Sequence, residues 1–522
     1  MQSCIGRAEL AASSSDRFIG DNDAALQKRF LDRARTRREL ISGEAITQFM
    51  HFNYCARKGW GRVKASKERR FRMVDFDLVL TGRVVRAADV IEKGFVAIRG
   101  ETIEFVGEGE PPAARERHDF GEALILPGAI DSQVHSLSQK DQEGFIWSTR
   151  SAAAGGVTTI VDMPYDDGNL ICDGEKLTRK ATEAGEQARV DFGLYGTVHP
   201  RAGAAEIPGM IKAGAVGFKF STFGTHPERF PRITPYILNE CFAEIAKHGL
   251  IAGIHNENDE FVRTAIAKVE ETGIRDYRAH ALSRPAIAEA LAMAEVYEIG
   301  AATGCSTHVV HCSISRGYDL CDSYRRQGFD TTVEACIHYL TLDEENDVAR
   351  LGGFAKVNPP IRSRDQVEAL WRHLAAGRIT VVSTDHVSWS RSLKSSPNML
   401  SNASGVPGLE TMYPLLLKGL SERGLSFSHA ARLLAANPAR LFRIGHRKGA
   451  LEIGRDADIA VFKPSAYIYS AAESGNNVVD WSPYDGIRMP YRAEATFLRG
   501  RLAFDGRNVV SEPGAGNVVR PL

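Results

Sequence analysis

The pattern of hydrophobic and polar positions first predicts a small β-sheet that begins near residue 73. Short runs there are apolar, or alternate between apolar and polar residues, and glycine turns separate them, as expected for strands. These runs lie at residues 76–82, 94–100, 102–109 and 123–128. Similar runs return near the C-terminus, at residues 448–464 and 492–507. One sheet built from both ends of the chain is therefore predicted.

Between these two regions the pattern changes its period. Apolar, β-branched runs such as residues 158–164, 251–255 and 380–385 alternate with amphipathic helical segments such as 283–303 and 363–377. Strand–helix alternation over such a span favours a parallel sheet closed into a (β/α)8 barrel. The predicted fold class is therefore α/β, a TIM-type barrel with a small β-sandwich domain formed from both ends of the chain.

The pattern also predicts the division into domains. Residues 73–127 and 440–522 form the small β domain, and residues 128–439 form the barrel. Residues 1–72 are charged and short of aliphatic side chains, which predicts a poorly ordered extension. Whether this extension belongs to the native protein is open from the sequence, because Met73 could serve as the start of the folded part.

Composition narrows the possible partners. The chain has 522 residues, and its 65 Lys and Arg balance its 65 Asp and Glu, so no overall field favours nucleic acid or an acidic membrane. No apolar run approaches the roughly 20 residues that span a bilayer. The eight cysteines are scattered without a CxxC pair, which suits a reducing compartment. We therefore expect a cytoplasmic protein that binds a small molecule and copies of itself.

Candidate catalytic residues follow the predicted barrel strands. Barrel enzymes carry their active groups at the C-terminal ends of the strands. Each candidate taken singly has a structural explanation, such as a capping Asp or a hydrogen-bonded His. Together, imidazoles and a carboxylate from separate strands form a ligand set suited to Zn²⁺ or a similar divalent ion. The candidates are His135, Lys219, His255, His311 and Asp385.

Gln133 is an unusual neighbour for such a set. Alternate residues of a strand point to the same side, so Gln133 and His135 share one face. A His-x-His pair here would supply half of a metal site. A glutamine oxygen is a neutral donor and a poorer zinc ligand than imidazole.

Several ordered motifs resemble those of the cyclic amidohydrolases, the group of dihydroorotase, allantoinase, hydantoinase and dihydropyrimidinase. They are "LPGAIDSQVH", "AAAGGVTTIVDMP", "VNPPIR", "STDH", "SGVPGLE", "NPARLF" and "KGALEIGRDADIAVF". The resemblance implies that carbon dioxide converts Lys219 to N6-carboxylysine, a carbamate that bridges two metal ions. It further implies that His255 and His311 hold one ion, and that His135 and Asp385 hold the other. Asp385 would also move the proton during hydrolysis of a ring C–N bond.

Gln133 leaves three outcomes open within this family. The site could stay binuclear with Gln133 as a weak ligand, or work with one metal held by Lys219, His255 and His311. It could also be inactive, as in structural relatives that keep the barrel without the chemistry. We favour retained activity, because Lys219 and Asp385 are both present.

The substrate is predicted less sharply than the reaction. The "SLSQK" segment lacks the Arg with which dihydroorotases bind a substrate carboxylate, which demotes that activity. The segments "VEACIHYLTL", "HALSRP" and "WSPYDG" look closest to allantoinase, so allantoin leads, with a hydantoin or dihydropyrimidine as runner-up. The family also implies a homotetramer or homodimer. Predicted substrate contacts are Ser313, Asn358, Phe223 and His338.

Overall fold

The computed structural model describes residues 76–139 and 142–522. The predicted extension at residues 1–72 and the proposed start at Met73 therefore lie outside the described residues. Lys140, the last residue of the "SLSQK" segment, also lies outside them.

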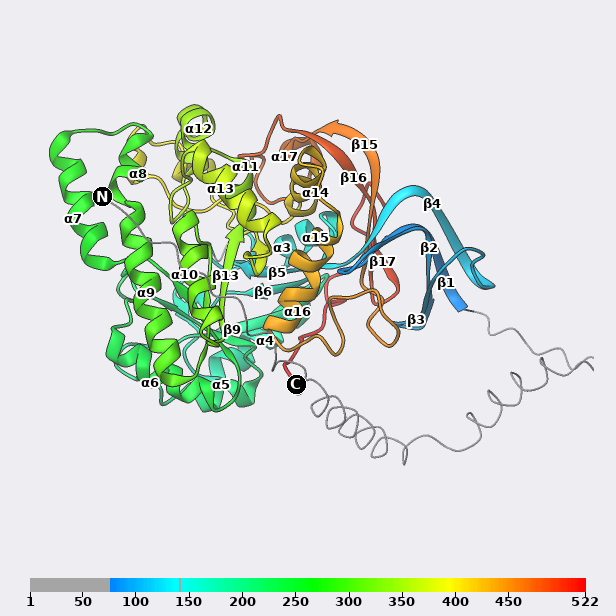
Figure 1. Cartoon of the computed structure of the whole chain (residues 1–522), viewed down its shortest axis with the longest axis horizontal. Coiled ribbons are helices and arrows are strands. Elements are labelled where there is room, and N and C mark those ends of the chain that lie inside the picture. The colour runs from blue at the N-terminus through cyan, green and yellow to red at the C-terminus, as the bar shows by residue number, and fades with distance from the viewer. Residues whose placement is uncertain (1–75, 140–141) are drawn as a thin grey trace, which may run out of the picture. The chain divides into compact units, whose positions relative to one another are not determined.

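A parallel eight-stranded sheet forms the barrel (Figure 1). Its strands are short, largely apolar and almost completely buried, which explains their β-branched composition. A parallel bridge between Val134 and His386 joins the last strand to the first. The predicted (β/α)8 barrel is thereby confirmed. The strands are β5 (Ala129–Val134), β6 (Val157–Asp162), β9 (Asp191–Gly196), β10 (Gly217–Ser221), β11 (Ile251–His255), β12 (Ser306–Val309), β13 (Thr331–Cys336) and β14 (Val381–Ser383).

Helices connect these strands and cover the outside of the barrel (Figure 1). Local signals set their ends: the Asn258 side chain accepts a hydrogen bond from the Phe261 amide at the start of one helix, and Gly273 ends that helix with a positive φ. The principal helices are α3 (Gly144–Ala154), α4 (Gly174–Gln187), α5 (Ile207–Ala213), α6 (Pro235–Ala246), α7 (Asp259–Thr272), α8 (Arg278–Ser283), α9 (Ala286–Thr303), α10 (Ser315–Arg326), α13 (Arg364–Ala375) and α14 (Met412–Glu422). Shorter helices are α11 (Ile337–Thr341), α15 (Ser428–Ala431) and α16 (Asn437–Leu441).

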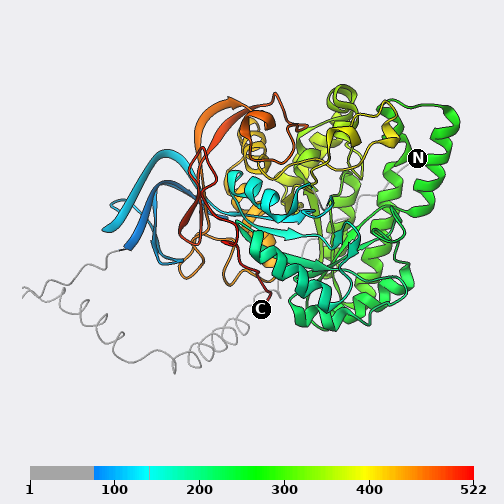
Figure 2. The ribbon, with the colours of Figure 1, turned by 180° about the vertical axis from the view of Figure 1, so that it is seen from behind.

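A second, seven-stranded mixed sheet lies to one side of the barrel in both ribbon views (Figures 1 and 2). Its order is β17-β16-β15-β4-β1-β2-β3, and β15 pairs antiparallel with β4, so both ends of the chain meet in one sheet, as predicted. It has its own apolar cluster around Leu80, Val96 and Ile459. Its strands are β1 (Phe76–Val85), β2 (Val90–Arg99), β3 (Thr102–Glu108), β4 (Ala114–Pro127), β15 (Ile459–Ile468), β16 (Arg488–Leu498) and β17 (Arg501–Phe504). The predicted division at residues 127/128 and 439/440 stays a prediction.

The chain passes directly from this sheet into the barrel. Only Gly128 separates β4 from β5, and a Cβ at this position would meet the Thr158 hydroxyl at 2.2 Å. Glycine is therefore required where this junction passes close to Thr158 of β6. Because β5 carries Gln133, this junction helps to fix the first strand of the candidate site.

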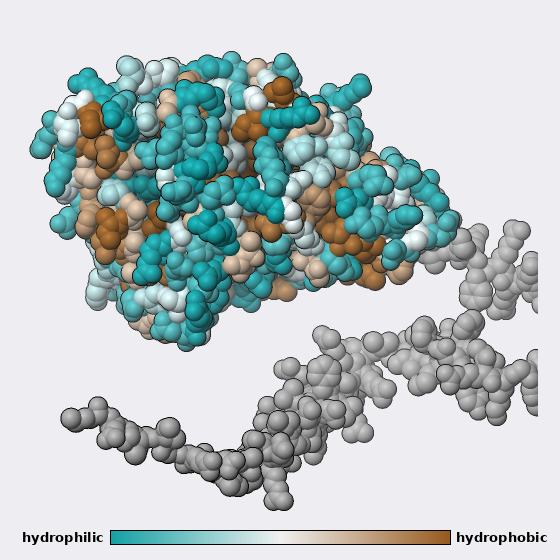
Figure 3. Space-filling model, turned by 45° about the horizontal axis from the view of Figure 1, so that its top comes forward, coloured by the Kyte–Doolittle hydropathy of each residue, from teal (hydrophilic) through white to brown (hydrophobic). Residues whose placement is uncertain are grey.

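The surface is mostly hydrophilic, with separate hydrophobic patches (Figure 3). Exposed apolar side chains include Leu282 in α8 and Ile287 and Leu291 in α9. Among the described residues, every helix is too short or too polar to reach across a bilayer.

Candidate active site

The C-terminal ends of the barrel strands surround one cavity of about 440 Å³. The residues that line it lie on β5, β10 and β11 and on segments that include those after β5, β12 and β14. Six predicted residues from distant parts of the sequence therefore share a single hollow. They are Gln133, His135, Lys219, His255, His311 and Asp385.

Gln133 lies beside Asp385. Its amide nitrogen donates a hydrogen bond to Asp385 Oδ1 over 2.6 Å, and His135 Nε2 lies 3.3 Å from the same oxygen. The other end of the amide, Gln133 Oε1, is buried and has no hydrogen-bond partner among residues 76–139 and 142–522. An unpartnered buried oxygen is costly, so this atom is a candidate ligand.

His255 and His311 face each other on the opposite side of the donor set. His255 Nδ1 lies 3.0 Å from His311 Nε2, and His255 Nε2 lies 2.8 Å from Glu257 Oε2. Glu257 also contacts Arg284. Burial lowers the pKa of both histidines, and the proximity of His255 lowers that of His311 further. Neutral imidazoles are the form that binds metals.

Lys219 is almost completely buried between these groups. Its ammonium has no salt bridge among the described residues, lies 3.4 Å from the Phe220 carbonyl oxygen and stands 5.8 Å from the Tyr165 ring centre. Burial lowers the pKa of Lys219 to about 7, against the opposing attraction of Asp385 and Glu334. A substantial share of its amine is then neutral near pH 7, as addition to carbon dioxide requires.

Two of the site residues have strained backbones. His311 has φ of 38° and Asp385 has φ of 50°, values that non-glycine residues rarely adopt. Buried polar contacts hold both segments in place. The His311 amide donates to Glu334 Oε1 over 3.2 Å, and the Thr384 amide donates to Asp131 Oδ1 over 3.2 Å. Strain retained at two facing strand ends is typical of functional sites.

This donor set fits a divalent cation. It offers three imidazoles, one carboxylate and one amide oxygen, and carbamylation of Lys219 would add a second anion. Two of its buried atoms, Gln133 Oε1 and His311 Nδ1, have no partner in the described part of the chain. A bound ion would satisfy such atoms.

The predicted substrate contacts are placed differently from one another. Asn358 lines the cavity, and its side-chain oxygen accepts a hydrogen bond from the Ser404 hydroxyl over 3.1 Å. Ser313 is buried beyond the cavity lining, where its hydroxyl contacts Glu289 and accepts a hydrogen bond from Arg362 Nε over 3.0 Å. The structure therefore brings Asn358 to the hollow and ties Ser313 into a buried ion pair.

The two remaining predicted contacts pack behind the cavity wall. The Phe223 ring lies 4.7 Å from the guanidinium carbon of Arg284, which itself lines the hollow. His338 is fully buried against Tyr339, and burial lowers its pKa to about 4. Both ring nitrogens of His338 lack a partner among the described residues.

The cavity lining also includes residues absent from the predicted set, among them Lys356, Trp389, Tyr165 and Arg229. Lys356 stands two positions before Asn358, and Trp389 stands four positions after Asp385, so each was close to a recognised motif. Tyr165 belongs to a small hairpin of β7 (Tyr165–Asp166) and β8 (Asn169–Leu170) that follows the second barrel strand. Arg229 lies in the loop after β10. Their motifs were visible in the sequence, but the direction of their side chains was not.

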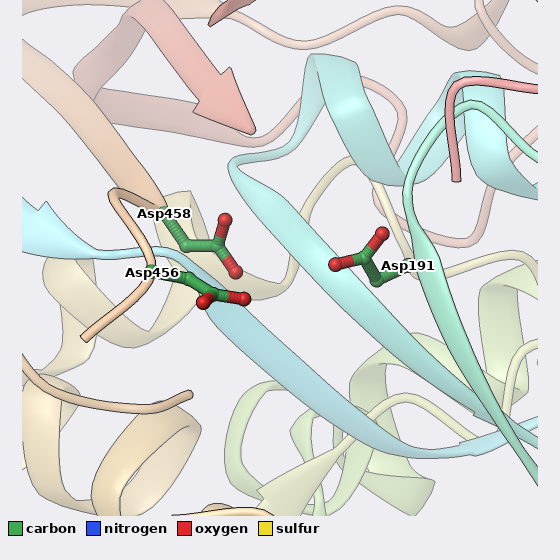
Figure 4. A group of neighbouring side chains, drawn as sticks. All are labelled: Asp191, Asp456 and Asp458. Carbon is green, nitrogen blue, oxygen red and sulfur yellow. The ribbon is translucent and has the colours of Figure 1, made fainter. Parts of the chain in front are cut away.

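A second group of acids lies elsewhere and has a different character (Figure 4). Asp191, Asp456 and Asp458 are close enough together to bind a metal ion. The Lys448 ammonium already lies among them, 2.6 Å from Asp458 Oδ2 and 2.9 Å from Asp456 Oδ2, and it also contacts Asp191. This lysine supplies the positive charge that an ion would bring.

Comparisons with known proteins identify relatives of this chain. The model of the Amidohydrolase family matches residues 124–494. The chain is 38% identical over 458 residues to an allantoinase of Rubrobacter xylanophilus, covering 86% of this chain and 98% of that protein. It is 29% identical to an L-hydantoinase of Paenarthrobacter aurescens, covering 85% and 98% of the two chains. Among solved structures, the L-hydantoinase (dihydropyrimidinase) of Arthrobacter aurescens superposes with a TM-score of 0.82 at 28% identity, covering 85% of this chain and all of that one.

Proposed function

This chain belongs to the amidohydrolase family as a homologue of allantoinases and hydantoinases, and on that premise we propose that it hydrolyses the C–N bond of a cyclic amide or ureide. The observation that carries the proposal is the convergence of six metal- and proton-handling side chains on one cavity at the strand ends. Members of this family typically depend on metal ions, so a divalent cation, most simply Zn²⁺, completes the proposed site.

The proposed ligands fall into two groups. Lys219, as N6-carboxylysine, would hold one ion together with His255 and His311, whose facing nitrogens are 3.0 Å apart. His135 and Asp385 would hold a second ion, with Gln133 Oε1 as an additional weak donor. The carbamate is chemically reasonable, because a buried ammonium would repel a cation whereas a carbamate attracts one.

When bound, the cation would polarise the ring carbonyl and lower the pKa of water at the site towards neutrality. Asp385 accepts the proton of the attacking water and passes it to the ring nitrogen as the C–N bond breaks. Gln133 is a positioning residue for this step, since its amide donates to Asp385 Oδ1 over 2.6 Å and limits rotation of the carboxylate. The ring opens to a carboxylate and an amine or urea group.

Gln133 bears on the number of ions. The contact with Asp385 fixes its nitrogen end, so only a neutral oxygen remains for a cation. We therefore propose that the position at His135 and Asp385 is the weaker of the two, and that the enzyme holds one ion firmly. A catalytically silent relative is the alternative, and it would contain no bound metal.

Allantoin is the proposed leading substrate, with a hydantoin or a dihydropyrimidine second. An allantoinase is the relative at 38% identity, and an L-hydantoinase stands at 29%. Dihydroorotate ranks below both, because the segment after His135 lacks an arginine. Assembly into a homotetramer or homodimer stays a prediction of the family.

A substrate panel tests the proposal. The protein is incubated with zinc, manganese or cobalt and bicarbonate, and ring opening of allantoin, hydantoin, dihydrouracil, dihydroorotate and succinimide is measured. Turnover of allantoin or hydantoin, lost in Asp385→Asn, is expected. Turnover of dihydroorotate alone would overturn the ranking, and absence of both metal and turnover would establish the silent alternative.

A further inference from the structure

The cavity lining contains more positive than negative side chains. Among the described residues that line it, Arg229, Arg284 and Lys356 are basic and Asp385 is the one carboxylate, while Lys219 would be an anion as the proposed carbamate. Arg284 already contacts Glu257, and Lys356 donates to the Leu400 and Asn402 carbonyl oxygens over 2.7 and 2.6 Å. Arg229 differs from these two because one of its guanidinium nitrogens has no hydrogen-bond partner among the described residues.

One nitrogen of the Arg229 guanidinium is fixed by a hydrogen bond, and another has no partner among the described residues. Its Nε donates to the Tyr165 carbonyl oxygen over 3.0 Å, and its guanidinium carbon lies 5.3 Å from the Phe230 ring centre. Its Nη2 is buried, with no hydrogen-bond partner among residues 76–139 and 142–522. Phe230 in turn packs against Tyr165, with ring centres 4.2 Å apart. The backbone contact and the aromatic stack thus fix the orientation of the guanidinium at the cavity wall.

Nearby acids do not neutralise this arginine by a direct contact. Asp166 belongs to the same hairpin as Tyr165, whose carbonyl oxygen accepts a hydrogen bond from Arg229. The Asp166 carboxylate is paired with Lys180 over 2.6 Å. Asp167 is exposed and attracts Arg229 without forming a salt bridge within 4.0 Å in the described part of the chain. A guanidinium nitrogen that is buried without a partner has lost its hydrogen bonds to water. A ligand that brings an acceptor oxygen would offset this cost.

We propose that Arg229 determines substrate specificity by donating a hydrogen bond to an oxygen of the ring's exocyclic substituent. This inference rests on the proposed function and narrows its substrate class to rings that carry an acceptor oxygen on the side chain. Arg229 stacks on Phe230, whose ring centre lies 6.2 Å from that of His135, so the guanidinium lies at the part of the cavity wall near His135.

Two substituents share this chemistry, a neutral ureido carbonyl and a carboxylate. A guanidinium donates to either oxygen, but the bond to a carboxylate is charge-assisted and stronger. Loss of a hydrogen bond to a charged group is expected to lower kcat/KM about 10- to 100-fold, and loss of a neutral one by less. An alkyl substituent offers no acceptor, so kcat/KM for a ring that carries one is expected not to depend on Arg229.

The test compares Arg229→Met with the wild type on four rings: hydantoin, 5-ethylhydantoin, allantoin and hydantoin-5-acetic acid. In the metal-loaded full chain, Arg229→Met is expected to raise KM for the two rings with an acceptor oxygen and to leave the other two nearly unchanged. Arg229→Lys is expected to recover part of the loss for the carboxylate and little for the ureido group. Calorimetric titration with the same rings measures binding without turnover. A failure of the proposed hydrolysis can therefore be distinguished from a failure of the proposed role of Arg229.

Arg263→Met is the matched control. Arg263 also lies against an aromatic ring, 5.4 Å from the centre of Phe223, but it is exposed and bonds to Asp259 and Gly224 outside the cavity lining. It should leave all four rings unaffected. An equal loss for all rings in Arg229→Met, or no selective change in either KM or binding, would overturn the inference. A preserved unfolding midpoint in Arg229→Met or Arg229→Lys excludes misfolding as the cause.

Discussion

Two buried polar clusters in this molecule each surround a buried lysine and differ in what that lysine contacts. The aspartate cluster consists of Asp191, Asp456 and Asp458 around Lys448, with Arg499 also in contact with Asp191. The cavity cluster consists of Gln133, His135, Lys219, His255, His311 and Asp385. Only the aspartate cluster has the tightly spaced acids of a metal site, yet it already holds a lysine.

The difference shows how stability and function use buried charge. Burial by itself would lower the pKa of Lys448, but the surrounding carboxylates outweigh it and raise that pKa. In the cavity cluster, burial of Lys219 prevails and lowers its pKa, while Gln133 Oε1 has no partner in the described part of the chain. A cluster with matched charges loses stability when one partner is removed, whereas unmatched buried donors cost stability and indicate a candidate binding site.

The largest expected effect comes from breaking the matched cluster. Lys448→Met leaves three buried carboxylates without their shared ammonium, so it should destabilise the protein by about 3–5 kcal/mol. Thermal and denaturant unfolding measure this. The surface pair of Lys463 and Glu494, 2.5 Å apart, is the control, and Lys463→Met should cost about 1 kcal/mol or less. Equal effects of the two substitutions would contradict the distinction.

Breaking the cavity cluster should have the opposite profile. Lys219→Met removes a buried ammonium that has no salt bridge among the described residues. The free energy of unfolding should therefore stay the same or rise, while bound metal and activity fall. Loss of several kcal/mol of transition-state stabilisation predicts a fall in kcat/KM of about 1000-fold or more. Metal analysis by plasma emission spectrometry and substrate kinetics measure both quantities. Full metal content in Lys219→Met would refute the role of Lys219 as a ligand.

Gln133 offers a finer test of the unmatched donors. Gln133→His exchanges a neutral oxygen for imidazole and should raise bound metal towards two ions per subunit. Gln133→Leu removes the hydrogen bond to Asp385 and should lower kcat about 10- to 100-fold, with a shifted pH–rate profile. Gln133→Asn keeps the amide but shortens its reach, and serves as the conservative comparison. If neither metal content nor the pH profile responds, Gln133 has no part in the site.

The last comparison concerns pH and two lysines of opposite environment. Burial, together with the nearby charge of Arg284, lowers the pKa of Lys356 to about 7, whereas the pKa of Lys448 is raised. An unfolded lysine titrates near 10.4, so between about pH 7 and pH 10 the unfolded chain holds more protons at Lys356 than the folded one. The stability contribution of Lys356 therefore rises with pH in this window.

Unfolding of Lys356→Met and Lys448→Met at a series of pH values measures this contrast. The stability difference between the wild type and Lys356→Met should change with pH in favour of the wild type as the pH rises above about 7. The difference for Lys448→Met should stay level there, because Lys448 is charged in both states until the pH approaches its unfolded value. Parallel curves for the two variants would contradict the assigned environments.

Much of the site's position was predictable, because periodicity locates strand ends. His135, His255, His311 and Asp385 each follow an apolar run, and in a parallel barrel all such ends open on the same side. The direction of individual side chains was less accessible. Ser313 follows its strand in the same way, yet its hydroxyl contacts Glu289 and Arg362 behind the cavity.

The sequence by itself determined the barrel, the sheet shared by both ends of the chain, and the family, since these depend on local patterns and ordered motifs. Only the tertiary structure decided that Gln133 bonds to Asp385 and that Lys448 lies within the aspartate cluster. It also decided that a buried nitrogen of Arg229 has no hydrogen-bond partner in the described part of the chain. The physical reason is that these contacts join groups far apart in the chain, at separations of a few ångströms. Such separations depend on how the whole barrel packs, and no local period encodes them.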